Sequence, residues 1–323
     1  MCLAFVVWLS VAEWKALERL LYADPNSTAF VVESVRGVMA GTPISRSWQH
    51  RFLGPLLVTA LGGADAVTLA RAGLLLLAAA NLLLFALLVR RGASLGAVVR
   101  TVAVYGVARF VLAYKLEYPW DGIDQLLFLA FGAWVAGGGT LRRWWPLLVV
   151  GLFNHETILY VPVWYALGRD RGQRLDALLS AVALGGGALA LRQAFYRGRP
   201  ALADQVFEEP LPVLDNHFHV THNLGQLFVH DWGSGRAHIA MGFLAAVLSF
   251  AWMCTRAELR RAASWSLVVL ATIMCFGYVN ETRHYLILVA FWTAYSGVRC
   301  ASGVSRSVPP PGDGRREPNE PPN

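Results

Sequence analysis

The chain has 323 residues, of which 56% are hydrophobic and only 15% are charged, and its formal net charge is +7. A water-soluble domain of this length needs more polar surface than this composition supplies, so we expect the lipid bilayer to be its main solvent. The basic residues stand in pairs and triplets between apolar runs, a pattern typical of membrane orientation that argues against nucleic acid as a partner.

A helix needs about 20 apolar residues to cross the hydrocarbon core of a bilayer. We therefore predict an all-α fold, a polytopic transmembrane helical bundle with about eight to ten membrane segments in the cell inner (cytoplasmic) membrane. The apolar runs that fit lie at roughly 1–22, 66–89, 96–114, 122–140, 174–194, 237–254, 262–279 and 284–300, with a shorter piece at 52–62.

The two ends of the chain differ from the runs between them. The opening MCLAFVVWLSVAEW has no basic leader and no small-residue cleavage site, so we interpret it as a retained first segment and not as a signal peptide. Residues 301–323 are polar and rich in proline, which predicts a disordered tail. This leaves one transmembrane helical domain over 1–300, with outer loops at 23–51 and 195–236.

Basic residues in short loops mark the cytoplasmic side of a membrane protein. Four basic clusters divide the apolar runs, and we expect all four inside: Arg90-Arg91, Arg142-Arg143, the stretch 169–174 and the stretch 256–261. The apolar run 144–168 lies between two of these clusters, so both of its ends belong inside. We predict a broken or re-entrant hairpin there; a single span is the alternative and would invert everything that follows.

The bend of this hairpin is expected at Asn154-His155-Glu156, in the stretch GLFNHETILYVP. Ionisable groups inside a membrane cost several kcal/mol unless they are paired or hydrated, so function is the default hypothesis for them. The alternative is a structural polar cluster in which Glu156 pairs with an arginine. We assign Glu156 a candidate catalytic role, and Asn154 and His155 a substrate-binding role.

The turn Asn280-Glu281-Thr282-Arg283-His284 repeats the same residue types before another apolar run. A guanidinium binds phosphate oxygens through a two-pronged geometry, so this turn suits a phosphate. An internal salt bridge of Arg283 with Glu281 or Glu156 is the alternative. We include Asn280, Glu281, Arg283 and His284 among the substrate-binding candidates.

The loop 23–51 supplies the remaining candidates. Asp24 follows the first membrane segment and is a candidate general base, while Arg46 and Arg51 are candidate phosphate ligands. The alternative for this loop is an amphipathic surface helix over 28–40 with a pair between Glu33 and Arg36.

For the acidic residues at the start of the apolar run 122–140, a structural role and a catalytic role are equally well supported. Asp121 either caps the helix predicted at 122–140 or takes part in catalysis. The nearby Asp124 is considered together with it.

Metal binding has one weak candidate. His217, His219 and His222 have a spacing that chelates in an extended segment, but no HExxH companion is present and loop histidines are often unused. We therefore assign no certain cofactor, with a divalent metal as the open alternative. The four cysteines form no CxxC pair and are expected to be inert thiols: Cys2, Cys254, Cys275 and Cys300.

The first 55 residues resemble the start of polytopic bacterial glycosyltransferases of the GT-C type. A first membrane segment precedes Asp24, a glycine-containing stretch and then Arg51-Phe52-Leu53-Gly54-Pro55, which is similar to the family's pattern of an acidic residue, a glycine and YRxLxP. The NHET and NETRH stretches are similar to signatures of bacterial membrane proteins with this layout, with His155 where an arginine is expected. The resemblance implies transfer of a sugar from a polyprenyl-phosphate donor at the extracytoplasmic face, with membrane lipid and the lipid-linked sugar as partners.

Three other classes of function compete with this interpretation, one of them a membrane scaffold without turnover. A transporter or flippase would use the broken 144–168 segment and Glu156 as a mid-membrane polar site, although no internal repeat is apparent. A membrane metalloenzyme would use His217, His219 and His222. The donor sugar, the acceptor and the oligomeric state are not encoded in any motif of the sequence.

Overall fold

The computed structural model describes residues 2–21, 25–42, 51–112, 118–168, 170–196, 220–225, 257–276 and 282–305. Every regular element in these ranges is a helix, which confirms the predicted all-α class. The helices are α1 (Cys2–Leu21), α2 (Pro25–Ala40), α3 (Leu53–Ala60), α4 (Ala66–Arg90), α5 (Leu95–Leu112), α6 (Pro119–Ala136), α7 (Trp145–Leu152), α8 (Tyr160–Ala166), α9 (Arg171–Tyr196), α10 (Val220–Gly225), α12 (Ala257–Phe276) and α13 (Leu286–Ser305).

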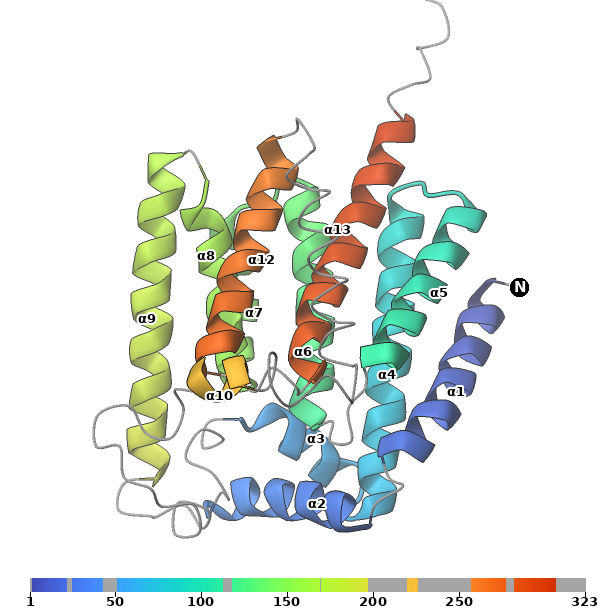
Figure 1. Cartoon of the computed structure of the whole chain (residues 1–323), viewed down its shortest axis with the longest axis vertical. Coiled ribbons are helices and arrows are strands. Elements are labelled where there is room, and N and C mark those ends of the chain that lie inside the picture. The colour runs from blue at the N-terminus through green and yellow to red at the C-terminus, as the bar shows by residue number, and fades with distance from the viewer. Residues whose placement is uncertain are drawn as a thin grey trace, which may run out of the picture.

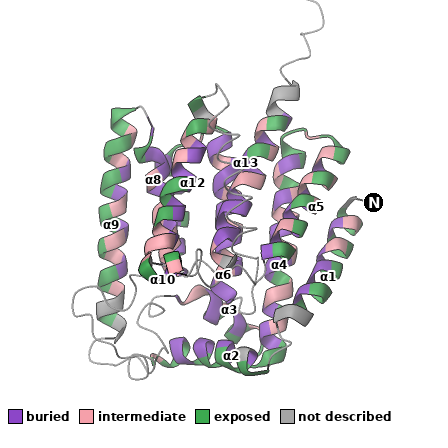
Figure 2. Ribbon diagram, viewed as in Figure 1, coloured by how far each residue is buried: buried purple, intermediate pink, exposed green. Residues whose placement is uncertain are grey.

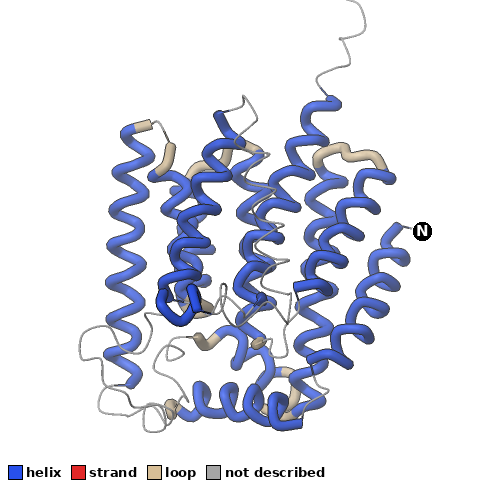
Figure 3. Tube along the Cα trace, in the orientation of Figure 1, coloured by secondary structure: helices blue, strands red, loops and turns tan. Residues whose placement is uncertain are grey.

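The long helices stand side by side with their axes roughly parallel, with α1 at one edge and α9 at the other (Figure 1). The tube drawing shows α2 lying across one end of this row, nearly perpendicular to the long helices (Figure 3). An amphipathic helix was one interpretation of residues 28–40, and the expected pair of Glu33 and Arg36 is present at 2.7 Å.

Within the described ranges, three helices are long and apolar enough to cross a membrane: α4, α5 and residues 171–191 of α9. The apolar part of α13, Leu286–Ala301, is shorter. Much of α9 is exposed (Figure 2), and apolar residues take part in this exposed surface, as Leu178 and Val182 illustrate at 60% and 65%. Exposed leucine and valine side chains on a long helix match the surface that lipid covers.

Aromatic side chains fill the centre of the bundle. Phe131 on α6 packs against Trp265 on α12 and Phe291 on α13, with ring centroids 6.0 Å and 5.7 Å away. Gly132 lets α6 and α13 approach closely, because a Cβ at this position would collide with the backbone carbonyl of Phe291. All three rings are fully buried.

The run 144–168 forms a hairpin of two short helices. α7 descends from Trp144, the chain turns at residues 153–155, and a short 3₁₀ helix, η3 (Glu156–Leu159), leads into α8. The rings of Trp144 and Trp164 both pack on Phe131, with centroids 5.5 Å and 6.3 Å away. The Tyr165 hydroxyl donates a hydrogen bond to the Gly139 carbonyl. Both ends of the run therefore lie at the same end of the bundle, as the broken-hairpin prediction requires.

Residues of the predicted basic clusters lie at that same end. Arg91 caps α4, and the Arg142 guanidinium pairs with Asp176 on α9 at 2.9 Å. Arg261 on α12 donates two hydrogen bonds to the carbonyl of Trp164. The charge pattern thus identified one end of the bundle correctly, while the hairpin bend points toward the other end.

One predicted boundary is wrong. α13 continues to Ser305, so residues 301–305 are helical, although the sequence placed them in the disordered tail. The predicted run 237–254 and residues 306–323 lie outside the described part of the chain.

Candidate functional site

The start of α6 brings the first carboxylates into position. Pro119 occupies the first turn, where its missing N–H costs nothing, and the Asp121 carboxylate accepts a hydrogen bond from the Tyr118 backbone N–H at 3.0 Å. Asp121 is therefore a capping residue, the structural alternative for it, though from the third helical position and not from the N-cap. One turn later Asp124 and Gln125 face the interior, at 3% and 0% exposure.

The hairpin bend is fastened to the segment that precedes α3. The Phe153 carbonyl accepts hydrogen bonds from the backbone N–H groups of Phe52 and Leu53 at 2.7 Å and 3.1 Å. His155 has an extended backbone, with φ of −162° and ψ of 147°, which interrupts the helix and turns three polar side chains toward α6. Arg51, directly before Phe52, is brought to the bend by the same contact.

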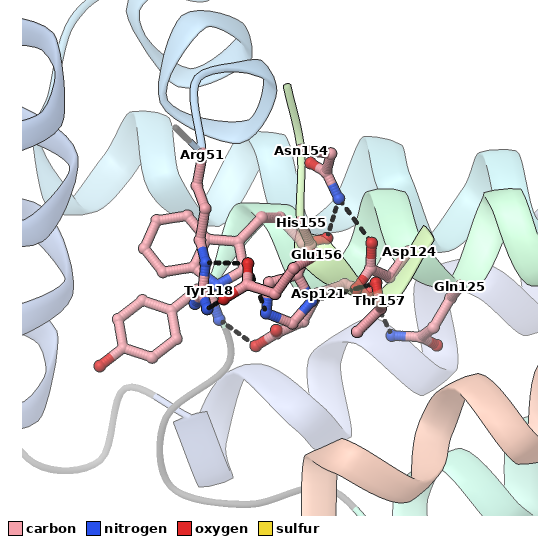
Figure 4. A network of polar contacts seen from close by, with 10 residues as sticks. Arg51, Tyr118, Asp121, Asp124, Gln125, Asn154, His155, Glu156 and Thr157 are labelled. Carbon is pink, nitrogen blue, oxygen red and sulfur yellow. Dashed lines mark hydrogen bonds and ion pairs between the residues drawn. The ribbon is translucent and has the colours of Figure 1, made fainter. Parts of the chain in front are cut away.

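Three side chains of the bend donate hydrogen bonds to the Asp124 carboxylate (Figure 4). The donors are the Asn154 amide, the Nδ1–H of His155 and the Thr157 hydroxyl, each at 2.7 Å. A buried carboxylate with this many donors is held in one orientation, and so are its donors. Asn154 also donates to the Trp120 carbonyl at 2.9 Å, which fixes the direction of its amide group.

The tautomer of His155 follows from this arrangement. Because an ionised carboxylate only accepts, Nδ1 carries the proton, and in the neutral ring Nε2 has a free lone pair. Nε2 lies 3.8 Å from a Glu156 carboxylate oxygen, which is too long for a direct hydrogen bond.

Arg51 and Glu156 form the second half of the site. The guanidinium donates from Nη2 and Nε to the two carboxylate oxygens of Glu156 at 2.9 Å and 3.3 Å. The Arg51 side chain is 11% exposed and the Glu156 side chain 40%, so this pair forms the more accessible rim of the site. The guanidinium also lies 5.6 Å from the centroid of the Trp120 ring.

The structure brings four of the predicted site residues together: Arg51, Asn154, His155 and Glu156. It adds Thr157 and Trp120, which the sequence did not single out, and Asp124, which the sequence offered beside Asp121 without assigning it to the site. The available signal was the spacing of Asp121, Asp124 and Gln125 after Pro119. Residues three or four positions apart share a helix face, so Asp121 shares one with Asp124 and with Gln125. No local pattern indicates that this face meets the NHET bend.

Of the other predicted site residues, the structure describes the side chain of His284. His284 lies in the 3₁₀ helix η8 (Thr282–Tyr285) directly before α13 and is half-buried. Outside the described residues lie Asp24, Arg46, Asn280, Glu281, His217 and His219, together with the side chains of His222 and Arg283.

Metal binding finds no support among the residues that the structure describes, because no group of three or more His, Cys, Asp or Glu side chains is placed to hold an ion there. Cys275 and Cys300 are free thiols, as expected. The buried Asp124 carboxylate accepts hydrogen bonds from an amide, an imidazole and a hydroxyl.

Comparisons with protein-family models, with curated proteins and with solved structures found no match for this chain. The conclusions about function therefore depend on the geometry of the site and on the sequence itself.

Proposed function

We propose that this chain is a multi-pass membrane enzyme that transfers a sugar from a lipid-phosphate donor, in a site that faces the extracytoplasmic side. The membrane part of the proposal is supported by the apolar outward faces of α4, α5 and α9 and by the basic residues at one end of the bundle. With that end in the cytoplasm, the run 144–168 is re-entrant and its polar bend is directed toward the opposite side.

The observation that carries the catalytic part is the buried Asp124 carboxylate holding His155 through Nδ1. A carboxylate that fixes the tautomer of an imidazole leaves Nε2 ready to accept a proton from a substrate hydroxyl. We assign His155 the role of general base and Asp124 that of positioning residue. This replaces the assignment of Glu156 as a base, since Glu156 is engaged by Arg51.

Arg51 supplies the second requirement of the reaction. A lipid-phosphate leaving group departs as an anion, and a guanidinium stabilises phosphate oxygens through charge and two hydrogen bonds. Glu156 holds the guanidinium in place at the rim, where the donor phosphate would compete for the same N–H groups. The Trp120 ring lies against the Arg51 guanidinium and limits its movement.

In the proposed step, the sugar moves from the phosphate oxygen of the donor to the oxygen of the acceptor. The acceptor hydroxyl gives its proton to His155 Nε2, its oxygen forms a bond to the anomeric carbon, and the bond between that carbon and the phosphate oxygen breaks. The electron pair of the broken bond stays on the phosphate oxygen, which Arg51 stabilises. The histidine proton then passes to solvent or to the leaving phosphate.

Transfer from labelled polyprenyl-phosphate sugars to acceptors, measured in membranes from cells that overproduce the chain, tests the proposal. We expect His155→Gln to lower the rate by about 10²- to 10⁴-fold, the usual contribution of a general base. Arg51→Gln should lower it strongly as well, whereas Arg142→Gln, which removes an exposed arginine at the basic end, should not. Transfer that persists unchanged in His155→Gln, or wild-type membranes without any transfer, would contradict the proposal.

A further inference from the structure

A second polar cluster lies between α1 and α4, apart from the site at the hairpin bend. It consists of Ser10 and Glu13 on α1 and Asn81 on α4, which are 2%, 8% and 0% exposed. Glu13 lies near the midpoint of α1, and Asn81 lies near the midpoint of α4. The cluster therefore sits at mid-depth in the bundle, where polar groups have no access to bulk water.

Hydrogen bonding in this cluster leaves two oxygens without a donor. The Asn81 amide donates to the Ser10 hydroxyl at 3.0 Å and to Glu13 Oε2 at 3.1 Å, while the Ser10 hydroxyl donates to the Val6 carbonyl at 2.8 Å. Every donor is used. Glu13 Oε1 and Asn81 Oδ1 are buried and accept no hydrogen bond within the described ranges.

The carboxyl group of Glu13 packs against α5. Among the residues that the structure describes, Glu13 forms no ion pair, and the side of its carboxyl group faces the backbone of Gly106 on α5. Arg109, one turn further along α5, is packed with its guanidinium 6.0 Å from the centroid of the Tyr105 ring. On α1 itself, Lys15 and Glu18 are exposed on other faces of the helix.

We propose that Glu13 and Asn81 form an intramembrane site for a single positive charge, supplied by a proton or by an alkali-metal ion. Glu13 Oε1 and Asn81 Oδ1 are buried acceptors without a donor, and a proton carried by Glu13 or a cation between them would satisfy both. An anion would repel both oxygens, and an apolar ligand would leave them unsatisfied. Ionisable residues at this depth mark ion and proton sites in membrane proteins.

Gly106 gives this site its shape. A Cβ at Gly106 would lie 3.4 Å from Glu13 Oε2 and 3.7 Å from Oε1, which is ordinary van der Waals contact. An ideal Cβ at Gly106 therefore fits into the space beside the carboxyl group without a clash. An alanine here would fill it without displacing the backbone, which would exclude an alkali-metal ion and its additional ligands but not a proton.

Thermal unfolding of the purified chain in detergent tests the alkali-metal form of the proposal. Tm is measured while sodium or potassium chloride replaces choline chloride at constant ionic strength. If an alkali-metal ion is the occupant, Tm rises by about 2 °C for each tenfold increase in its concentration above Kd. The rise should be lost in Glu13→Gln and in Gly106→Ala, and it should persist in Glu18→Gln, a matched change at an exposed position of the same helix.

Infrared difference spectra recorded between acidic and alkaline pH test the proton form. If a proton is the occupant, one component of the carboxylic acid C=O band, at the frequency of a buried group, is present in the wild type, in Glu18→Gln and in Gly106→Ala, and is missing in Glu13→Gln. Size-exclusion and circular dichroism profiles establish that each variant is folded. A folded Glu13→Gln that matches Glu18→Gln in both the cation series and the infrared spectra would overturn the proposal.

Discussion

The two buried polar clusters of this chain contrast in how their carboxyl groups are satisfied. At the hairpin bend, the Asp124 carboxylate accepts hydrogen bonds from three side chains, all at 2.7 Å. At the contact between α1 and α4, Glu13 accepts one bond from Asn81, and one of its oxygens has no donor. The first cluster is saturated and holds its members in one geometry, as a catalytic site requires. The second retains capacity for a positive charge.

The largest expected effect comes from removing the carboxylate of the saturated cluster. Asp124→Ala removes the buried acceptor that Asn154, His155 and Thr157 share, so we expect the free energy of unfolding to fall by about 3–5 kcal/mol. Thermal or denaturant unfolding in detergent measures this loss.

Asp176→Ala is the control for that substitution, because Asp176 pairs with Arg142, whose side chain is 80% exposed. Exposed pairs contribute at most about 1 kcal/mol. Equal losses in the two variants would mean that the cluster at the bend does not stabilise the fold.

A smaller effect is expected from the glycine that lets α3 approach the site. A Cβ at Gly54 would lie 2.6 Å from the Trp120 backbone nitrogen and 2.9 Å from the Pro119 carbonyl carbon, and neither backbone atom can move easily. Gly54→Ala should therefore cost about 1–3 kcal/mol and separate Arg51 from the bend, which lowers both the Tm and the transfer rate.

Gly106→Ala, beside Glu13, is the paired measurement for the second cluster. Its contacts begin at 3.4 Å, and we expect it to change stability by less than about 0.5 kcal/mol. If both glycine substitutions are tolerated equally, the close approach of α3 to α6 is not what positions Arg51.

Replacing the unsatisfied cluster with apolar residues should cost little. Glu13→Met combined with Asn81→Leu removes both polar partners at once. The Ser10 hydroxyl then loses the hydrogen bond that it accepts from Asn81 but keeps the one that it donates to the Val6 carbonyl. We expect the free energy of unfolding to stay within about 1 kcal/mol of the wild type. A loss as large as that of Asp124→Ala would indicate that Glu13 is satisfied as fully as Asp124.

The smallest effect concerns a solvated carboxylate, which gives a reference for acid titration. The backbone N–H of Thr68 donates to Asp65 at the N-terminus of α4 and holds the pKa of that carboxyl group below its usual 3.8. Since the folded-state pKa is the lower one, its stabilisation is present above the unfolded pKa and is lost as the pH falls through the folded pKa.

We therefore expect Asp65→Ala to reduce the loss of stability on acidification below about pH 4, without altering the response of either buried cluster. Unfolding followed at several pH values measures it. A steeper acid dependence in the variant would reverse the sign that we assign.

Much of the architecture was predictable from the sequence because the determining signals are local. Apolar runs marked helices whose observed bounds differ from the predicted ones by a few residues, as with α4 at 66–90 against 66–89. The position of the hairpin followed from two basic clusters that flank one apolar run. α6 began earlier than predicted because Pro119 and the Asp121 cap extend the helix beyond its apolar part.

The sequence by itself determined which residues of the bend are polar and that they interrupt an apolar run, because both properties belong to consecutive residues. Only the tertiary structure decided their partners. Asp124 meets His155 across 31 residues, and Arg51 meets Glu156 across 105. Such contacts depend on how helices pack against one another, and helical periodicity fixes the face of each helix but not the neighbour that it meets. The same holds for Glu13, whose burial against Asn81 follows from the packing of α1 on α4.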